Sequence, residues 1–473
     1  MWTDVRRYKM FLNLDKKYGE KVAAIDCSGA QITYGDLCAY AQSFGKAMPE
    51  RTLIFVLAKN MIGSLLGYTS ALINHVVPLV ISANTEKTLF DNLFETYQPE
   101  YLWLPEEMVT DEYALTDYGA FGYVLVKTKY FGEAQHKLHL ELSLLLPTSG
   151  STGSPKLVRH SYRNIEANAE NVKNLFGLTE DERPMVVLPM HYTMGLSVIA
   201  SHLYTGATLL LCDKSMLDKE FWTMMKELQA TSFTGVPYSY ELLSKVRFFR
   251  MDLPYLKTIT QGGGKMTPEL FTTCAEYAER TGKRFIATYG QTECTARMAY
   301  LPAELAMTKI GSIGIAEPGG QLSIVDNEGK ETFEGEATGE MVYRGENVTM
   351  GYATCKEDLS KGDENHGIMY TGDLARRDAD GCYFIIGRLK RFLKIYGLRI
   401  GLDEIENIIK SNLKIDCYCS GSDEKLVVYI TDERMSEQVI ELVEEKTHLF
   451  HQNIEIKVVP QILRNEAGKV IMQ

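Results

Sequence analysis

The sequence has no apolar run long enough to cross a membrane and no C-x-x-C pair of cysteines. Its most apolar stretch, residues 52–82 of 473, is interrupted by Lys59, Asn60, Asn74 and His75, whereas a membrane span needs about 20 continuous apolar residues. The first residues also lack the apolar segment of a secretory signal. The nine cysteines are scattered and include no C-x-x-C pair, which is typical of a reducing compartment. We therefore expect a soluble cytoplasmic protein without a membrane span.

Positive charge is in deficit as well. Lys and Arg number 50 against 62 Asp and Glu, which gives a formal net charge of -12. This balance argues against a surface for nucleic acid or anionic lipid, because such surfaces neutralise phosphates. Hydrophobic residues make up 45% and charged residues 24%, which excludes a disordered or fibrous chain. At about 150 residues per domain, the length predicts two to four structural units.

Short β-rich runs alternate with helical stretches over the first part of the chain, which predicts parallel strands with crossover helices. A first α/β block is expected from strands at 52–57, 76–81 and 101–104 with helices at 62–73 and 89–97. A second is expected from strands at 185–188, 207–211, 232–234 and 285–287 with helices at 196–204 and 221–228. Between the blocks, residues 142–155 are a strand-like run that ends in Ser, Thr and Gly.

After about residue 309 the sequence pattern changes to short β-rich segments separated by glycines. Strands are expected at 311–315, 321–325, 340–343 and 382–386, in an antiparallel or barrel-like region. Beyond residue 390, a helix with Ile405, Ile408 and Ile409 on one face precedes a strand at 426–431, a helix around 439–443 and a strand at 454–458. The predicted fold is therefore a large α/β domain, residues 1–389, with two sheet subdomains and a β-rich region at 310–389. A small mobile α+β domain follows at 390–473, with a hinge at Lys390.

The segment PTSGSTGSPK, residues 147–156, is suited to binding a polyphosphate. Small residues let backbone N–H groups converge on an anion, hydroxyls add donors, and Lys156 adds a point charge. It is not a Walker A element, which would require Gly in place of Pro155 and a hydroxyl in place of Leu157. Taken alone, the segment is also compatible with a solvated loop.

The pentapeptide YGQTE, residues 289–293, follows a predicted strand. Tyr289 can offer its ring to an adenine face, and Thr292 can donate to a phosphate. Glu293 is a hard oxygen ligand suited to Mg²⁺. On the pentapeptide alone, a core aromatic and a solvated carboxylate are equally good interpretations.

Three consecutive glycines, Gly262, Gly263 and Gly264, would let a flat base approach the backbone closely. A Rossmann dinucleotide site is the competing idea. It would need a further glycine at Met266 or at Thr267, and neither position holds one.

Taken together with four other segments, these motifs resemble the ordered signatures of the adenylate-forming superfamily, which includes acyl- and aryl-CoA synthetases, carrier-loading adenylation domains and firefly luciferases. ITYGDL at 32–37, TSGSTGSPK at 148–156 and QGGGKM at 261–266 resemble the early, phosphate-loop and adenine-side elements. YGQTE at 289–293, TGD at 371–373, GRLK at 387–390 and GK at 468–469 follow in the family's order. The resemblance extends from about residue 30 to the C-terminus.

The resemblance implies a site for ATP, and later AMP, with Mg²⁺ held by Glu293. Asp373 would accept from the ribose hydroxyls and Arg388 would donate to the same sugar, although Asp373 alone is also a common turn former. The implied nucleotide-binding residues are Thr148, Ser149, Gly150, Ser151, Thr152, Gly153, Lys156, Gly262, Gly263, Gly264, Lys265, Tyr289, Gly290, Gln291, Asp373 and Arg388.

The resemblance also implies a two-step reaction in which the acid and ATP first give acyl-AMP and pyrophosphate. Thr292, Glu293 and Lys469 would be the catalytic residues, and Lys469 would offset the repulsion between carboxylate and triphosphate. The small domain would then rotate about Lys390 and present Lys394 and Gly397 to a thiol, which belongs to CoA or to the phosphopantetheine of a carrier protein in trans.

The expected acyl pocket comprises His191, Tyr192, Thr193, Gly235, Val236 and Ala287. Superfamily members that activate α-amino acids usually have an Asp where Thr193 aligns, and an unpaired buried ammonium would be costly. We therefore expect a small or medium carboxylic acid without an α-ammonium.

Two alternatives stay open, a D-alanine-type amino-acid ligase for a carrier protein and an inactive nucleotide-binding relative. The chain also departs from the family pattern, with Leu157 after the phosphate loop, Lys265 after the glycines and Arg391 after the hinge.

Overall fold

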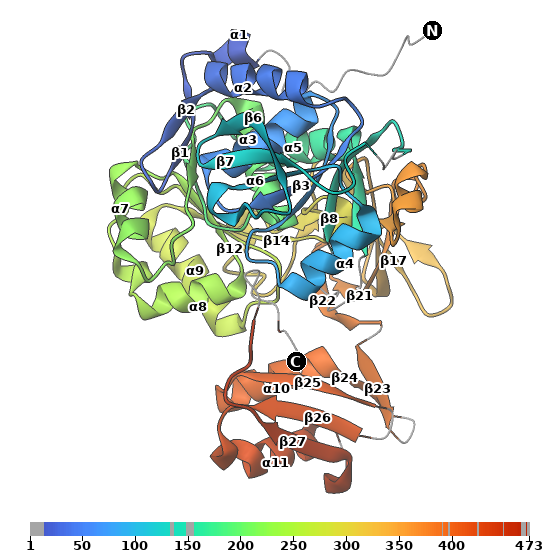
Figure 1. Ribbon diagram of the computed structural model, residues 1–473. Coiled ribbons are helices and arrows are strands. Elements are labelled where there is room, and N and C mark those ends of the chain that lie inside the picture. The colour runs from blue at the N-terminus through green and yellow to red at the C-terminus, as the bar shows by residue number, and fades with distance from the viewer. Residues whose placement is uncertain are drawn as a thin grey trace.

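The computed structural model is a large α/β body with a small C-terminal unit beside it (Figure 1). The residues that it describes are 14–132, 137–147, 156–389, 391–395, 398–422, 425–447, 449–464 and 470.

The described residues form two large sheets. The first has a parallel centre, because β3 pairs with β4 and β5 in parallel and β4 pairs with β8 in the same way. Every residue of β3 is buried, as expected for a strand covered on both faces. The strands in spatial order are β20 (Tyr352–Ala353), β9 (Leu157–Ser161), β8 (Leu142–Pro147), β4 (Val77–Ser82), β3 (Leu53–Ala58), β5 (Tyr101–Pro105), β7 (Tyr123–Lys127) and β6 (Ala114–Ala120).

The second sheet carries the strand ends that matter for function. Its central pairs β10–β12, β12–β13 and β13–β14 are all parallel. The N-terminal strand β1 joins it by pairing with β11, which the sequence analysis did not predict. The strands in spatial order are β16 (Ile315–Ala316), β15 (Ala299–Tyr300), β14 (Arg284–Tyr289), β13 (Thr258–Gln261), β12 (Ser232–Gly235), β10 (Pro184–Val186), β11 (Leu209–Leu211), β1 (Val22–Asp26) and β2 (Gln31–Thr33).

Helices fill the space between these sheets and cover their outer faces (Figure 1). One buried cluster unites side chains of both sheets with α2 (Tyr34–Ala47), α3 (Ile62–Ile73), α5 (Tyr162–Phe176) and α6 (Thr193–Thr205). A second cluster packs α4 (Lys87–Tyr97) on the outer face of the first sheet. A third packs α7 (Lys219–Glu227), α8 (Pro237–Lys245) and α9 (Pro268–Thr281) on the outer face of the second sheet.

The predicted β-rich region is an antiparallel sheet with its own buried cluster. Its strands in spatial order are β18 (Glu331–Thr332), β17 (Gly320–Val325), β19 (Ala337–Gly345), β21 (Ile368–Arg377) and β22 (Tyr383–Arg388). The predicted strand at 311–315 is wrong for most of its length. Gly311 and Gly314 have φ values of +78° and +76°, and this left-handed backbone ends an extended segment.

The small C-terminal unit surrounds a separate core of aliphatic side chains. Within it β25 and β26 pair antiparallel, and β26 and β27 pair parallel. Its elements are β23 (Phe392–Ile395), β24 (Leu398–Gly401), α10 (Leu402–Leu413), β25 (Cys417–Ser422), β26 (Lys425–Ile430), α11 (Ser436–Thr447) and β27 (Ile454–Val458). An exposed ion pair connects it to the large body, with Lys414 Nζ 2.6 Å from Glu269 Oε1.

The membrane and cysteine predictions concern parts of the chain that the structure describes. Within that part, no helix combines the length and the apolar character that crossing a bilayer requires. All nine cysteines lie in described segments and all are free thiols.

Candidate active site

The candidate site lies where β12, β13 and β14 reach their carboxyl ends. In parallel open sheets, ligands bind outside these ends. The residue pair Gly235 and Gln261 stands in register with Ala287, so the three loops that follow start at one edge of the sheet. This edge therefore gathers the predicted Gly235–Val236, glycine-turn and YGQTE segments.

A hydrogen-bonded cluster joins the YGQTE segment to the β-rich sheet. The Tyr289 hydroxyl donates to Asp373 Oδ2, and Gln291 Nε2 donates to the same oxygen at 3.1 Å. Arg388 Nε lies 2.9 Å from Asp373 Oδ1, so both oxygens of this carboxylate have partners. Asp373 pairs with Arg388 across β21 and β22. The structure thus brings together four residues that lie up to 99 positions apart in the sequence.

The electrostatics of this cluster follow from burial. The Asp373 side chain is 3% exposed, while that of Arg388 is 54% exposed. Burial, and secondarily the Asp373 charge, holds the pKa of Tyr289 well above its ordinary value, so its hydroxyl stays a donor at neutral pH. Two cis hydroxyls of a sugar could replace the tyrosine and amide donors on Asp373, with Arg388 at the rim.

A second cluster forms around Glu293. Tyr352 of β20 donates its hydroxyl to Glu293 Oε1 at 2.7 Å. The same tyrosine ring carries Lys156 Nζ on its face, 3.4 Å from the ring centroid, which is a cation–π contact. The antiparallel pairing of β20 with β9 makes this possible, because it brings Tyr352 beside Val158.

Glu293, the predicted magnesium ligand, lies in a described part of the chain. Among the described residues no group of three or more His, Cys, Asp or Glu is arranged to hold a metal. A single carboxylate nevertheless suits Mg²⁺, which commonly uses one or two carboxylates together with water and substrate phosphates. The chemistry of Glu293 beside Lys156 therefore fits a magnesium ion carried by a polyphosphate.

The glycine turn packs against the expected acyl pocket. Gly263 has φ +77°, and a Cβ there would lie 2.5 Å from the Tyr192 hydroxyl. A Cβ on Gly262 would lie 2.5 Å from Met194 Cε. The protein's own packing thus requires these glycines, independently of any bound base.

Some of the expected acyl residues lie on the inner side of the sheet, and others face its outer side. Tyr192 and Val236 pack in one cluster with Leu188, Met194 and Ala296. Thr193 is buried, and its hydroxyl lies 3.1 Å from that of Thr292. Burial lowers the pKa of His191 to about 4 and raises that of Tyr192 to about 12, so both side chains are neutral at pH 7.

Gly235 and Ala287 direct their Cβ positions toward the outer core, and their place in the acyl pocket stays a prediction. Ala287 packs in the outer core against α9, and a Cβ on Gly235 would meet Ser239 and Tyr240 of α8. Because side chains alternate along a strand, the inner face at this level carries Ile286 and Thr288 instead. Loop spacing alone did not reveal which face of each strand was turned inward.

Two residues that depart from the family pattern, Lys265 and Arg391, make specific contacts in the structure. Lys265 Nζ donates to the Ile385 carbonyl oxygen at 3.2 Å, which connects the glycine turn to β22. Arg391 forms ion pairs with Asp403 and Glu406 on α10, and so belongs to the framework of the small unit.

Several predicted site residues lie outside the described residues or have undescribed side chains, and their roles stay predictions. The residues outside are Thr148, Ser149, Gly150, Ser151, Thr152, Gly153, Lys390, Gly397 and Lys469, and the undescribed side chain is that of Lys394.

Tyr352, which contacts both Lys156 and Glu293, belongs to none of the predicted site segments. It lies in a two-residue strand outside every motif, and no local pattern distinguishes it. Its position depends on the pairing of distant strands, which sequence spacing does not express.

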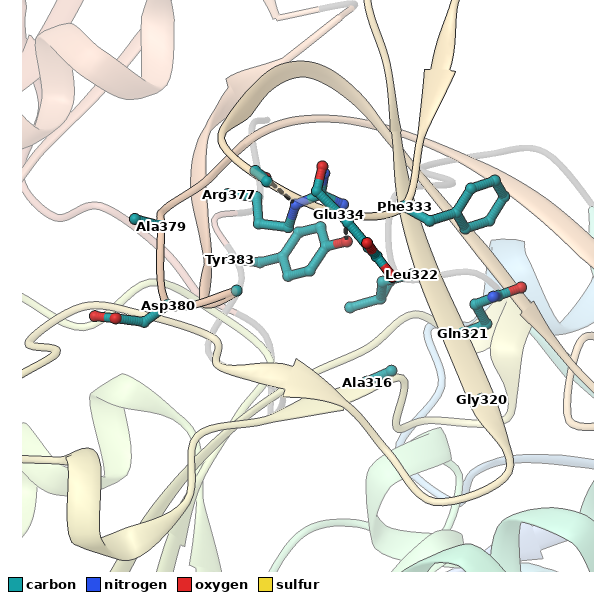
Figure 2. Close-up of a pocket in the computed structure, with 12 residues that line it drawn as sticks. Ala316, Gly320, Gln321, Leu322, Phe333, Glu334, Arg377, Ala379, Asp380 and Tyr383 are labelled. Carbon is teal, nitrogen blue, oxygen red and sulfur yellow. Dashed lines mark hydrogen bonds between the residues drawn. The ribbon is translucent and has the colours of Figure 1, made fainter.

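A separate open hollow of about 450 Å³ lies in the β-rich region and contains none of the predicted site residues (Figure 2). The buried Arg377 lies at its wall, where its guanidinium donates to backbone carbonyl oxygens and to the Tyr383 hydroxyl. The hollow is therefore not part of the nucleotide site.

The layered body, the small C-terminal unit, the Tyr289–Asp373 cluster and the Glu293–Tyr352 cluster define the adenylate-forming class of folds. The family model described as AMP-binding enzyme matches residues 101–353, more than half of the chain. The chain belongs to the AMP-binding enzyme family.

Individual relatives agree with this assignment. The chain is 30% identical to an oxalate–CoA ligase of Arabidopsis thaliana over 272 residues, covering 56% of this chain and 52% of that protein. It is 27% identical to a 2-succinylbenzoate–CoA ligase of Bacillus cereus, covering 72% and 69%. The chain spans about half the length of the first curated relatives it matches.

Solved structures show the fold over nearly the whole chain. O-succinylbenzoate coenzyme A synthetase from Bacillus subtilis, in complex with AMP, superimposes with a TM-score of 0.79 at 18% identity. The match covers 98% of this chain and 96% of that one.

Proposed function

We propose that this chain is an AMP-forming ligase that joins a carboxylic acid to a thiol, with acyl-AMP as the intermediate. The observation that carries the proposal is the convergence of Tyr289, Gln291, Asp373 and Arg388 at the carboxyl ends of β12 to β14. This cluster has the chemistry to bind an adenosine, with an aromatic ring beside a buried carboxylate. Lys156 and Glu293 both contact Tyr352, and we expect the triphosphate to extend toward them.

The electrostatic problem of the first step is to bring a carboxylate against a triphosphate. Lys156, the residue before β9, supplies one cation. By family resemblance, Lys469 supplies a second cation from the small unit. Glu293 would hold Mg²⁺, which neutralises phosphate charge when bound. A related synthetase has been solved with ATP and a magnesium ion, which supports these two ligands. The acid attacks the α-phosphorus directly, so the protein needs to supply orientation and positive charge rather than a nucleophile.

The proposed acid lacks an α-ammonium. Thr193, at the position where amino-acid-activating members carry an Asp, is buried and bonded to Thr292. A buried ammonium there would have no carboxylate partner on that side chain, which costs several kcal/mol. This disfavours the D-alanine-type alternative.

The proposed thiol acceptor is CoA, since the curated relatives are named as CoA ligases. In the second step the small unit rotates about Lys390, withdraws Lys469 and presents the segment around Lys394 and Gly397 to the thiol. A carrier-protein phosphopantetheine is the alternative acceptor, and direct comparison of the two thiols distinguishes them.

Acid-dependent exchange of labelled pyrophosphate into ATP tests the proposal. We expect exchange with members of a panel of fatty, aromatic, hydroxy and dicarboxylic acids and none with α-amino acids. With CoA added, turnover should release AMP. Release of ADP would contradict the proposal, and so would exchange confined to amino acids. Absence of exchange with every acid, in protein that binds ATP, would favour an inactive nucleotide-binding relative.

A further inference from the structure

A small cavity lies between α5, α6 and the strands β12 and β13. Its wall includes Val198, Ser201 and His202 of α6, Thr234 and Thr260 of the strands, and Arg297. The free space is about 20 Å³, enough for about one water-sized group. Most of the lining side chains are polar, including the carboxylate of Glu182, and Val172, Phe176 and Leu178 complete the wall.

The strand register and the helix rise place the cavity one level deeper than the expected acyl residues. Thr234 and Thr260 share a strand face with Val236 and Gly262, because side chains two positions apart point the same way. On α6, Ser197 lies one turn deeper than Thr193, a rise of about 6 Å. Met194, with Leu188, Val236 and Ala296, fills the space between the two levels. A flexible methionine can move aside for a ligand more readily than a branched side chain.

Arg297 is the strongest feature of this cavity. Its side chain is 1% exposed, and its Nη1 donates to Ser197 Oγ at 2.7 Å. Its Nε has no partner among the described residues. Within that described part, Arg297 also forms no ion pair, since the carboxylate that bears on it, Glu317, lies beyond salt-bridge distance. A buried guanidinium with a free donor is costly unless something else accepts from it.

Glu317 has one occupied and one unpaired carboxylate oxygen, since its Oε2 has no hydrogen-bond partner among the described residues. Its Oε1 accepts from Asn171 Nδ2 at 3.1 Å, from the Tyr343 hydroxyl at 3.1 Å and from Asn347 Nδ2 at 2.8 Å. Burial raises the pKa of Glu317 to about 8, which weakens its ability to neutralise the arginine at pH 7.

The cavity also offers an acceptor. His202 Nδ1 lies 2.7 Å from the Val198 carbonyl oxygen, so Nδ1 carries the proton and Nε2 presents its lone pair. Nε2 has no partner among the described residues. Burial lowers the pKa of His202 to about 4, so the ring is neutral at pH 7.

The backbone is strained at the two residues before Arg297. Thr295 and Ala296 have φ values of +50° and +85°, a left-handed conformation that residues with a Cβ rarely adopt twice in succession. Such strain persists where the surrounding structure requires a particular side-chain placement. Here it directs the chain from the catalytic Thr292–Glu293 segment to Arg297 within a few residues.

We propose that the acid activated by this protein carries an oxygen acceptor at its far end, a hydroxyl or a second carboxylate, and that Arg297 binds this group. The inference rests on the proposed ligase function and specifies its substrate class. The one-turn offset of about 6 Å corresponds to about four or five C–C bonds of about 1.5 Å. The substrate is therefore an acid of about four to six carbons with a polar terminus.

The test compares straight-chain acids of this length that end in a methyl, hydroxyl or carboxylate group. In pyrophosphate exchange, kcat/KM for one of the polar termini should exceed that for the methyl terminus by at least about tenfold, since sites built to hydrogen-bond a substrate group reject analogues that lack it. The hydroxyl and carboxylate arms identify which acceptor is bound.

Variants assign the preference to Arg297. Arg297→Met should abolish the preference, while Arg297→Lys should retain part of the preference for the carboxylate. The ratio of kcat/KM for two acids is measured on one preparation. A lower fraction of folded protein changes both values equally and leaves the ratio unchanged. Thr260→Val, which removes a hydroxyl from the same wall, provides a second variant if Arg297→Met does not fold. Arg377→Met is the matched control, an equally buried arginine in the distant hollow, and should leave the ratio unchanged.

The outcomes separate the two proposals. A preference for the methyl terminus, or a ratio that Arg297→Met and Thr260→Val both leave unchanged, overturns the inference while the ligase function stands. Pyrophosphate exchange only with acids outside the panel also overturns the inference and leaves the ligase function standing. Absence of exchange with every acid overturns both.

Discussion

Asp373 is the residue on which the proposed nucleotide site most depends. Its carboxylate is buried and receives donors from Tyr289, Gln291 and Arg388, which are contributed by different loops and strands. The sequence analysis predicted all four residues from short motifs. It had no means of showing that they share one carboxylate, because the motifs carry no distances.

Asp373→Asn should raise the KM for ATP in pyrophosphate exchange by about 10- to 100-fold. The amide keeps the size of the side chain but loses the charge, and hydrogen bonds to charged groups contribute about 1.5–3 kcal/mol. The exposed Asp432→Asn variant, in the small unit, is the control. Equal effects of both substitutions on the KM for ATP would contradict the role given to Asp373.

Lys469→Ala should lower the adenylation rate by about 100- to 1,000-fold, the scale of removing one transition-state charge contact. Transfer from preformed acyl-AMP to CoA should change little, because the proposed second step does not use this lysine. Both half-reactions can be measured separately by exchange and by thioester formation. A comparable loss in both would show that Lys469 has a different role.

At the scale of elements, the pairing of β20 with β9 assembles the metal-side half of the site. β9 belongs to the segment after the phosphate loop, and β20 lies between β19 and β21 of the β-rich sheet, 190 or more positions later in the chain. Their contact places the Tyr352 ring between Lys156 and Glu293. The sequence predicted the helices and strands of this region largely correctly, since buried runs and amphipathic periodicity are local. It missed β20, which is two residues long.

Tyr352→Phe should raise the Mg²⁺ concentration for half-maximal exchange a few-fold, about the loss of one hydrogen bond on Glu293. Tyr352→Leu should be more damaging, because it also removes the cation–π contact with Lys156, worth about 0.5–2 kcal/mol. Magnesium titration of the exchange rate measures both. If the Leu variant is no worse than the Phe variant, the ring has no electrostatic role.

At the scale of the whole molecule, buried histidines couple stability to pH. Burial lowers the pKa of His160 to about 3 and those of His191 and His202 to about 4. The unfolded chain, with histidines near 6.5, binds more protons than the folded chain between these values. The free energy of unfolding should therefore be fully present above about pH 6.5 and fall as the pH is lowered toward 4.

His160→Gln should make this acid-side decline shallower by about one proton, or about 1.4 kcal/mol per pH unit. Urea unfolding at several pH values between about 5 and 7 measures the slope. The slope is diagnostic even if the substitution also lowers stability at pH 7. An unchanged slope would mean that His160 does not titrate on unfolding in this range.

The sequence by itself determined the family, the order of the motifs and most of the secondary structure, because small loop residues, buried runs and amphipathic helices are local properties of the chain. Only the tertiary structure decided which faces of β12 to β14 turn inward, which set Ile286 and Thr288 rather than Ala287 on the inner face of β14. It also decided the contacts of Tyr352 and the buried position of Arg297. These depend on strand register and packing between segments far apart in the chain, and no local pattern encodes such distances.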